Sequence, residues 1–209
     1  MSPPEPRLLQ RVEEAAGAIL AGEVVAFPTE TSYGLAAAWD LPRPLELIFQ
    51  MKGRPAGKPL LLLLAHGGQL PMVTSAVPLA ARPLMERFWP GPLSLLLPAR
   101  PGLPWALTGS TGRVGVRISS HPLALELTAR VGRPITATSA NRAGLPPALS
   151  PQEVAEQLGP AGLSLIMDGG TLPPSPPSTI VDVTASPPRL VREGRVEWRE
   201  IEEALAPLR

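Results

Sequence analysis

The sequence has no cysteine and very few histidine and aromatic residues. Of its 209 residues only two are histidines, His66 and His121, and aromatic residues make up 4%. The lack of cysteine excludes disulfide bonds and thiolate metal sites, and two histidines argue against a histidine-based metal cluster. We therefore expect no metal ion that is held by protein side chains alone.

Long apolar runs and a strong net charge are also missing. The leucine-rich run at 60–64 is followed by His66 and two glycines, far short of the length that spans a membrane. Residues 1–10 lack the charged and then apolar layout of a signal peptide. The formal net charge of +1 gives no general attraction to nucleic acid, although it leaves room for a local basic groove. These features predict a cytoplasmic enzyme without a membrane anchor.

Helical and strand-like segments alternate along the whole chain, which is typical of an α/β protein. Apolar spacing and helix-start signals predict helices at 7–21, 44–51, 79–88, 122–131 and 198–206, and a further helix that begins with a capping box at Ser150–Glu153. Apolar or alternating runs predict strands at 24–27, 60–64, 93–97, 113–118, 134–138, 163–167, 179–183 and 190–192. Because some strands follow one another without a helix, we expect a mixed sheet with flanking helices in one domain, residues 1–209.

Both lysines of the chain lie in one short segment, KGRPAGK at 52–58. The other 17 of the 19 basic residues are arginines. Lysine is a compact, rotatable charge, whereas arginine presents a planar fork, so Lys52 and Lys58 indicate a requirement for lysine itself. Two interpretations are equally consistent with this segment alone. It is either an anion-binding loop in front of the strand at 60–64 or an ordinary solvated basic turn.

Polar loops stand at the ends of the predicted strands, where open α/β sheets bind their ligands. The loops are 28–34, 52–58, 108–113, 138–142 and 175–179. Their hydroxyl groups are suited to orienting a small polar substrate, but turn formation and helix capping explain many such residues equally well.

The strand at 113–118 alternates strictly, so that Arg113 and Arg117 share the face opposite its valines. Arg117 is an anion ligand if that face is concave and a plain surface charge if the face is solvated. His121, which precedes Pro122, and His66 are interpreted as structural residues. Asp168 and Asp182 stand at strand ends, where they are either metal or hydroxyl partners or turn formers.

Six ordered segments between residues 27 and 183 resemble the YrdC family. They are FPTETSYGLA (27–36), KGRPAGKPL (52–60), WPGPLSLLL (89–97), GRVGVRISSHP (112–122), ITATSANRAG (135–144) and STIVDV (178–183). The family's K-x-R and S-x-N signature is present as Lys52, Arg54, Ser139 and Asn141.

The resemblance implies a YrdC-like twisted open sheet with a concave basic cavity, and an L-threonylcarbamoyladenylate synthase. Such an enzyme joins L-threonine, bicarbonate or carbon dioxide, and ATP into threonylcarbamoyl-AMP and pyrophosphate. The product supplies the N6-threonylcarbamoyl group of adenosine 37 in tRNA through downstream transfer proteins. Mg²⁺ is expected to accompany ATP, held mostly by phosphates and water. Direct binding of tRNA or double-stranded RNA is a further implication.

The resemblance also assigns roles to individual residues. The catalytic set is Lys52, Arg54, Ser139 and Asn141. The ATP-binding set is Arg54, Lys58, Thr138, Ser139, Asn141 and Arg192, with Lys52 beside the triphosphate as well. The threonine-binding set is Thr29, Thr31, Tyr33, Arg117 and Ser178, in which Arg117 takes the carboxylate as a bidentate pair.

Three positions depart from the family pattern. Glu193 stands where relatives often have proline, which places a negative charge beside Arg192. Arg113 stands where threonine is frequent, so its role is left open. Pro146-Pro147 replaces a segment that usually offers a hydroxyl group.

Other functions compatible with the sequence are a YciO-like paralogue, which shares the R-E-G ending, a non-catalytic protein that binds structured RNA, and a carbamoyl-transfer module. The low net charge argues against general RNA binding. The sequence is expected to correspond to the short family members, which have no additional C-terminal domain.

Overall fold

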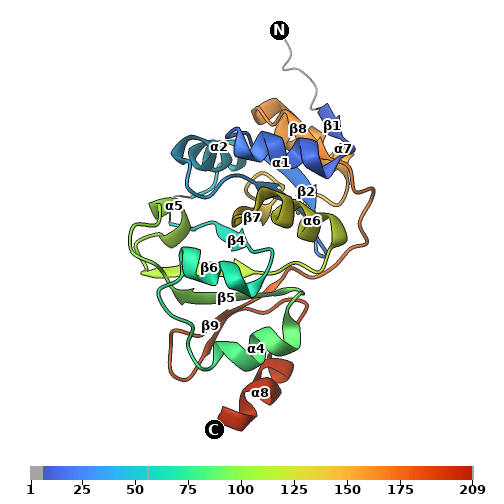
Figure 1. Ribbon diagram of the computed structural model, residues 1–209. Coiled ribbons are helices and arrows are strands. Elements are labelled where there is room, and N and C mark those ends of the chain that lie inside the picture. The colour runs from blue at the N-terminus through green and yellow to red at the C-terminus, as the bar shows by residue number, and fades with distance from the viewer. Residues whose placement is uncertain (1–6, 56, 209) are drawn as a thin grey trace.

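The computed structural model describes residues 7–55 and 57–208, and within them shows a ten-stranded sheet flanked by helices (Figure 1). The strands are β1 (Arg7–Leu9), β2 (Val25–Pro28), β3 (Tyr33–Ala36), β4 (Leu61–Leu63), β5 (Leu93–Pro98), β6 (Arg113–Arg117), β7 (Ile135–Ser139), β8 (Leu165–Met167), β9 (Thr179–Asp182) and β10 (Arg189–Arg192). The helices are α1 (Val12–Leu20), α2 (Pro42–Lys52), α3 (Leu70–Val73), α4 (Ala81–Phe88), α5 (Trp105–Thr108), α6 (Pro122–Val131), α7 (Pro151–Leu158) and α8 (Trp198–Leu205).

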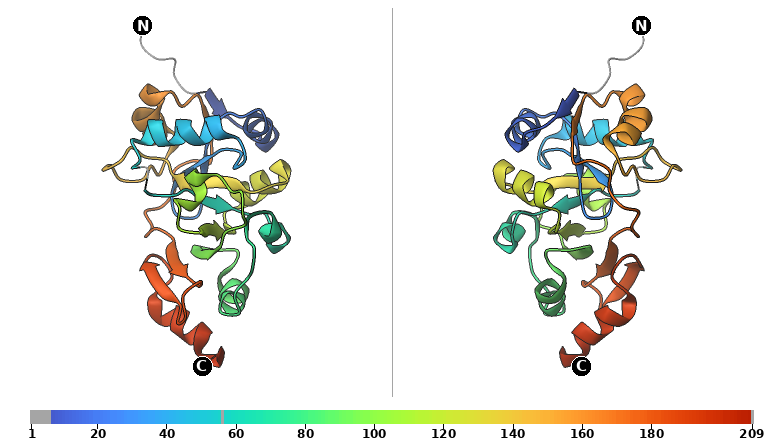
Figure 2. Two further views of the ribbon diagram at one scale, coloured as in Figure 1. Left: turned by 90° about the vertical axis from the view of Figure 1, so that its left-hand side faces the viewer. Right: turned by 90° about the vertical axis from the view of Figure 1, so that its right-hand side faces the viewer.

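The strands follow the order β1-β8-β2-β3-β7-β4-β6-β5-β9-β10. Strands β8, β6 and β9 pair in parallel with β2, β4 and β5, respectively, whereas β3 is antiparallel to both β2 and β7. The sheet is therefore mixed and open, as predicted. Its two ends lie far apart, since α1 and α8 occupy opposite ends of the molecule in every view (Figures 1 and 2).

Helices cover the two faces of the sheet unequally. Helices α1 and α6 pack on one face of β2, β3 and β8, where Ile19, Leu127 and Phe27 belong to one apolar cluster. Helices α2 and α7 cover the opposite face, and Figure 2 shows α7 on the side away from α1 and α6. Near the other end, α4 and α8 pack against the face of β5 that carries Leu93 and Leu95. In the described part of the chain, the other face of β6, β5 and β9 lines a cavity.

Two strands were not predicted from the sequence. Residues 7–9 were expected to begin a helix, because Leu8 and Leu9 fit its apolar spacing, but they form β1, paired in parallel with β8. The predicted loop at 28–34 turns within itself, and Tyr33 already begins β3. Both differences have the same cause, since pairing with a distant strand decides the conformation of a short segment more strongly than local spacing does.

Helix ends follow the predicted signals more closely. Helix α6 has the predicted bounds, and α2 begins earlier than predicted, at Pro42. The capping box before α7 is only half formed. The Ser150 hydroxyl accepts a hydrogen bond from the Glu153 amide at 3.2 Å, but the Glu153 carboxylate accepts from Leu149 instead. The short helices α3 and α5 were missed, because single turns carry little periodic signal.

Candidate functional site

A cavity of about 990 Å³ lies over the face of the sheet that the helices leave uncovered. Its floor is formed by alternating residues of β5 and β6, by Ile180 of β9 and by β4. Its walls come from the loops at 29–34, 54–60, 137–139, 146–149 and 174–178, together with β10. All five predicted polar loops, which lie far apart in sequence, therefore contribute residues to one cavity, and the loop at 108–113 contributes Thr111 and Arg113.

Strand β6 places two arginines on the cavity floor, as its alternation predicted. Arg113, Gly115 and Arg117 all line the cavity, whereas Val114 and Val116 are buried in the core behind it. Gly115 leaves no room for a larger side chain, because an added Cβ would lie 2.0 Å from Leu61 Cδ2. The floor between the two arginines is therefore apolar, covered by the side chains of Leu61 and Leu96.

Arg117 forms a buried ion pair with Glu30, which the sequence did not single out. Its Nη1 lies 2.7 Å from Glu30 Oε1, and the two side chains are 8% and 10% exposed. The hydroxyl of Ser119 donates to the other carboxylate oxygen of Glu30. Burial lowers the pKa of Arg117, and the charge of Glu30 acts in the opposite direction. The carboxylate thus holds the guanidinium in place at one end of the cavity.

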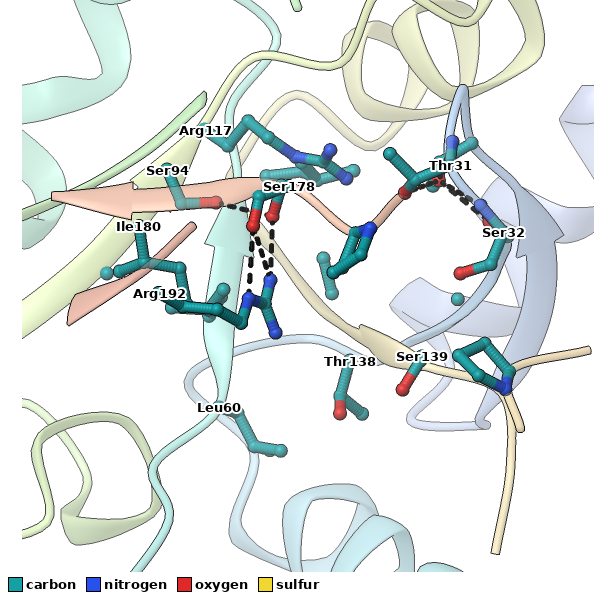
Figure 3. Close-up of a pocket in the computed structure, with 18 of the residues that line it drawn as sticks. Thr31, Ser32, Leu60, Ser94, Arg117, Thr138, Ser139, Ser178, Ile180 and Arg192 are labelled. Carbon is teal, nitrogen blue, oxygen red and sulfur yellow. Dashed lines mark hydrogen bonds between the residues drawn. The ribbon is translucent and has the colours of Figure 1, made fainter. Parts of the chain in front are cut away.

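Ser178, at the start of β9, connects this end of the cavity to Arg192 on β10. Arg192 donates from Nε and Nη2 to the Ser178 carbonyl at 3.1 and 2.7 Å, and Nη2 also reaches the Ser178 hydroxyl at 3.1 Å. That hydroxyl lies 3.2 Å from the hydroxyl of Ser94. Figure 3 shows these bonds, with Arg117 close to Ser178. Ser178, which was assigned to threonine, and Arg192, which was assigned to ATP, are therefore in direct contact.

The loop that was predicted to bind threonine is stabilised by hydrogen bonds of its own threonine hydroxyl groups. Thr29 Oγ1 lies 3.1 Å from Thr31 Oγ1 and 2.7 Å from the Ser32 carbonyl, which accepts its proton (Figure 3). Thr31 lines the cavity with Ser32 and Tyr33. This turn sets the position of Thr31 relative to Glu30, its neighbour in sequence.

The hydroxyl of Tyr33 is already engaged by the proline-rich segment at 169–177. It donates to the Gly170 carbonyl at 2.8 Å and accepts from the Gly169 amide at 2.9 Å. Burial raises the pKa of Tyr33 to about 12, and the charge of Asp168 adds to this effect. Pro174 and Ser175, farther along the segment, line the cavity. Tyr33 therefore anchors part of the cavity wall, and its hydroxyl has both of its hydrogen bonds within the protein.

Lys52 is held within the S-x-N turn. Its ammonium group donates to the Ser139 carbonyl, to the Asn141 carbonyl at 2.8 Å and to Asn141 Oδ1 at 3.1 Å. The residue is 4% exposed, and among the described residues Ser139 lines the cavity whereas Lys52 and Asn141 do not. The signature was predicted to present Lys52 to a triphosphate. The geometry instead shows its three donors occupied by the turn that carries Ser139.

Arg54 and Thr138 lie on the cavity wall, close to each other. Arg54 donates to Thr138 Oγ1 at 3.2 Å, to the Lys58 carbonyl at 2.7 Å and to the Pro59 carbonyl at 2.9 Å. Burial lowers the pKa of Arg54, and the positive charge of Arg192 lowers it further. Lys58 is exposed and lines the cavity from the same loop. The loop is thus shaped by Arg54 and leaves Lys58 accessible to a ligand.

The ammonium group of Lys52 provides a prediction about pH. Burial, and then the charge of Arg54, lower the pKa of Lys52 from 10.5 to about 7. Between these two pH values the unfolded chain binds more protons at this residue than the folded chain does, so the free energy of unfolding gains from Lys52 as the pH rises. Urea unfolding of the wild type and Lys52→Met at pH 7 and pH 9 should show the wild type gaining on the variant. An equal difference at both values would contradict the shifted pKa.

The departures from the family pattern have structural explanations. The Glu193 carboxylate accepts a hydrogen bond from the Trp198 amide at 2.9 Å, so it caps the start of α8 instead of facing Arg192. Gly194 has no room for a side chain, because an added Cβ would lie 2.0 Å from the Pro177 carbonyl oxygen. Pro146 and Pro147 line the cavity and supply apolar wall where a hydroxyl was expected.

The two aspartates and two histidines have internal roles. Asp182 pairs with Arg113 and accepts two hydrogen bonds from Thr184, and Asp168 accepts one from the Gly170 amide at 2.9 Å. His121 accepts from the Leu123 amide and so caps α6, as its structural interpretation required. His66 precedes the short 3-10 turn at Gly67–Gln69. Within the described residues, no group of three or more histidine, cysteine, aspartate or glutamate side chains is arranged to hold a metal ion.

The electrostatics of the cavity favour an anion. Five cationic side chains line it, namely Arg54, Lys58, Arg113, Arg117 and Arg192. Burial lowers the pKa of Arg192, and the charge of Arg117 lowers it further, so the cations repel one another. A negatively charged ligand would relieve this repulsion. Glu30 and Asp182 already pair with Arg117 and Arg113, so the charge left for a ligand to match is mainly that of Arg54, Lys58 and Arg192. No helix in the described part of the chain is long and apolar enough to span a bilayer.

A family profile and individual relatives match this chain. The profile of the Sua5, YciO and YrdC family, described as "Telomere recombination", matches residues 17–194. The threonylcarbamoyl-AMP synthase of Pyrococcus abyssi is 41% identical over 205 residues, which cover 96% of this chain and 60% of that protein. The threonylcarbamoyl-AMP synthase of Bacillus subtilis is 38% identical over 199 residues, covering 95% and 57%. The chain therefore spans less than two thirds of the length of these relatives.

Solved structures show the same fold. Pyrococcus abyssi Sua5 complexed with L-threonine matches with a TM-score of 0.88 and 40% identity, over 95% of this chain and 60% of that one. Escherichia coli YciO matches with a TM-score of 0.79 over 96% of this chain and 100% of that one, but at 24% identity the likeness concerns the fold alone. Together the profile, the relatives and the fold show that the chain belongs to the Sua5, YciO and YrdC family.

Proposed function

We propose that this protein is a threonylcarbamoyl-AMP synthase that uses L-threonine, bicarbonate or carbon dioxide, and ATP. The observation that carries the proposal is the single cavity in which Arg117 and Ser178 stand at one end and Arg54, Lys58 and Arg192 on the surrounding walls. One end is suited to an amino acid carboxylate and the rest to a polyphosphate. The similarity to synthases of the same family supports this assignment.

Threonine would bind at the Arg117 end. The guanidinium has one Nη bonded to Glu30 and keeps further N–H donors for a substrate carboxylate. Thr31 and Ser178 offer hydroxyl groups for the threonine amine and side chain. Such a set of short polar side chains around one fixed charge is suited to a small zwitterion.

ATP would lie across the rest of the floor. The carbamate oxygen formed from threonine attacks the α-phosphorus, the bond from that phosphorus to the bridging oxygen of the β-phosphate breaks, and pyrophosphate leaves with the electron pair. Every species in this step is anionic, so Arg54, Lys58 and Arg192 would act by offsetting charge and by positioning. Lys52 and Asn141 would act through the turn that places Ser139, without touching the phosphates.

Mg²⁺ belongs to the proposal as a partner of ATP. The acidic side chains nearest the cavity, Glu30 and Asp182, are each paired with an arginine. They are therefore poorly suited to coordinating a cation, and the ion would be held by phosphates and water, where it neutralises charge on the triphosphate. Transfer of the threonylcarbamoyl group to tRNA by partner proteins is proposed from the family alone.

The activity can be tested by following pyrophosphate release from the purified protein with ATP, Mg²⁺ and bicarbonate. Release is expected only when L-threonine is present, because threonine supplies the attacking carbamate. Omitting bicarbonate from degassed buffer should lower the rate, and mass spectrometry should detect threonylcarbamoyl-AMP. Pyrophosphate release that does not depend on threonine, or tight binding of double-stranded RNA without any release, would overturn the proposal.

A further inference from the structure

Strand β6 carries a second arginine, Arg113, at the end of the cavity away from Arg117. The two are four positions apart on the extended strand, which is about 13 Å at 3.3 Å per residue. Gly115 lies between them, and the side chains of Leu61 and Leu96 pack over it, so the floor between the two arginines is apolar. The roles derived above use Arg117 for threonine and leave Arg113 without a function.

Arg113 is held in place by a buried carboxylate. Its Nη1 pairs with Asp182 Oδ2 on β9, across the intervening strand β5. Asp182 is 4% exposed and is fixed in turn by Thr184, whose amide and hydroxyl donate to Oδ1 at 2.9 and 2.6 Å. The Arg113 side chain is itself 38% exposed and lines the cavity. A guanidinium has five N–H donors, so the pair with Asp182 leaves donors for a ligand.

The surroundings of Arg113 are also suited to an anion. Thr111, two residues earlier, lines the cavity and carries a hydroxyl group. The segment before it touches the Lys58 loop, since the Leu60 amide donates to the Ala106 carbonyl at 2.8 Å. An added Cβ at Gly109 would lie 3.3 Å from Pro59 Cδ, which again shows the two loops in contact. The segment that leads into Arg113 therefore lies beside the loop that carries Lys58, and both residues line the cavity.

The geometry of the proposed reaction suggests which group of ATP would lie at the Arg113 end of the cavity. In phosphoryl and nucleotidyl transfer the attacking and leaving oxygens lie roughly in line through the phosphorus. If the carbamate approaches from the Arg117 end, the pyrophosphate must depart on the opposite side of the α-phosphorus. Along β6 that opposite side is the end marked by Arg113.

We infer that Arg113, positioned by Asp182, binds the β- and γ-phosphates of ATP and the departing pyrophosphate together with Lys58. The inference rests on the proposed function for the identity of the ligand. It assigns the two arginines of one strand to the two ends of one reaction, with threonine at Arg117 and pyrophosphate at Arg113. Arg113 touches the leaving group in this arrangement, whereas Asp182 is a positioning residue.

The test compares the wild type with Arg113→Met, which removes the charge and keeps most of the stem, and with Asp182→Asn, which keeps Arg113 but weakens its anchor. Arg82→Met removes an exposed arginine from α4, outside the cavity, and serves as the control. Binding of inorganic pyrophosphate and of L-threonine is measured separately by calorimetry on each protein. The KM for ATP and product inhibition by pyrophosphate are measured in the pyrophosphate-release assay.

Arg113→Met is expected to weaken pyrophosphate binding about tenfold, in the range of one charge-assisted contact, and to raise the KM for ATP while threonine affinity stays within twofold. Asp182→Asn should show a smaller change in the same direction, and Arg82→Met none. Unchanged pyrophosphate affinity in Arg113→Met, or equal losses for pyrophosphate and threonine, would overturn the inference. Circular dichroism and thermal unfolding identify a variant that has failed to fold, in which case Asp182→Asn decides.

The two proposals can fail separately. A wild type that binds pyrophosphate but shows no threonine-dependent release would refute the synthase activity, and the binding comparison would still decide whether Arg113 holds the anion. A wild type that releases pyrophosphate with threonine, together with an Arg113→Met variant that binds pyrophosphate normally, would keep the activity and reject the role of Arg113.

Discussion

Arg117→Met is expected to abolish threonine binding and to lower the free energy of unfolding by about 3–5 kcal/mol. The two effects have different causes. Threonine binding is lost because the guanidinium assigned to the threonine carboxylate disappears. Stability falls because Glu30, which is 10% exposed, is left as a buried charge without its partner. Calorimetric titration with L-threonine and urea unfolding measure the two effects independently.

The double variant Glu30→Gln with Arg117→Met separates these causes. Glutamine keeps the shape of the side chain and can still bond to Ser119, but it carries no charge to leave uncompensated. The double variant should therefore regain much of the lost stability and still fail to bind threonine. A double variant as unstable as the single one would show that Glu30 was not the source of the destabilisation. Threonine binding by either variant would remove Arg117 from the binding site.

Lys52→Arg is expected to reduce threonine-dependent pyrophosphate release about 100-fold, even below pH 7, where both side chains carry a positive charge. Lys52 directs three N–H bonds from one nitrogen at three oxygens of the turn at 139–141. A planar guanidinium is wider and cannot take the same position at 4% exposure without moving the turn. Displacing a positioned group by about 1 Å can cost 100-fold in rate. The measurement is steady-state pyrophosphate release at saturating substrates.

Lys58→Arg provides a matched comparison, because it makes the same change in the same short segment. Lys58 is exposed on the cavity loop, so a guanidinium can supply its charge there, and the loss should stay below tenfold. Threonine affinity should be nearly unchanged in Lys52→Arg, since Arg117 and Ser178 lie on other strands. Equal losses in the two variants would mean that Lys52 acts only as a charge.

Structural features that depend on residues close together in sequence were predicted well. The alternation in β6 placed Arg113 and Arg117 on one face, and the structure shows that face as the cavity floor. The proline and glycine signals gave α6 its bounds. The prediction of a helix at residues 7–9 was wrong. Leu8 and Leu9 also fit a helical spacing, and only pairing with β8 selects the strand conformation of β1.

Contacts between residues far apart in sequence could not be predicted. Glu30 sits in a polar turn like any other acidic residue, and its role depends on a bond to Arg117, 87 positions away. The surroundings of Lys52 and Arg54 in the K-x-R segment also could not be predicted from the sequence. Gly53 ends α2 with a left-handed φ of 59°, so the chain reverses between Lys52 and Arg54. Consequently the two cations face different surroundings, the first toward the S-x-N turn and the second toward the cavity, although only one residue separates them.

The strand order has a consequence for protein synthesis. The threonine loop and the Lys58 loop belong to the first third of the described chain, but Ser178 directly precedes β9, and Arg192 lies in β10, so both are synthesised after the other strands of the described sheet. Until then β5 is an edge strand with open hydrogen-bonding groups, because β9 is its partner on that side. A nascent chain halted before residue 178 would thus carry most of the sheet and most of the cavity lining, but it would lack Ser178, Ile180 and Arg192 and would leave one edge of β5 unpaired. Synthesis of β9 and β10 therefore completes the cavity lining and, at the same time, gives β5 its missing hydrogen-bonding partner.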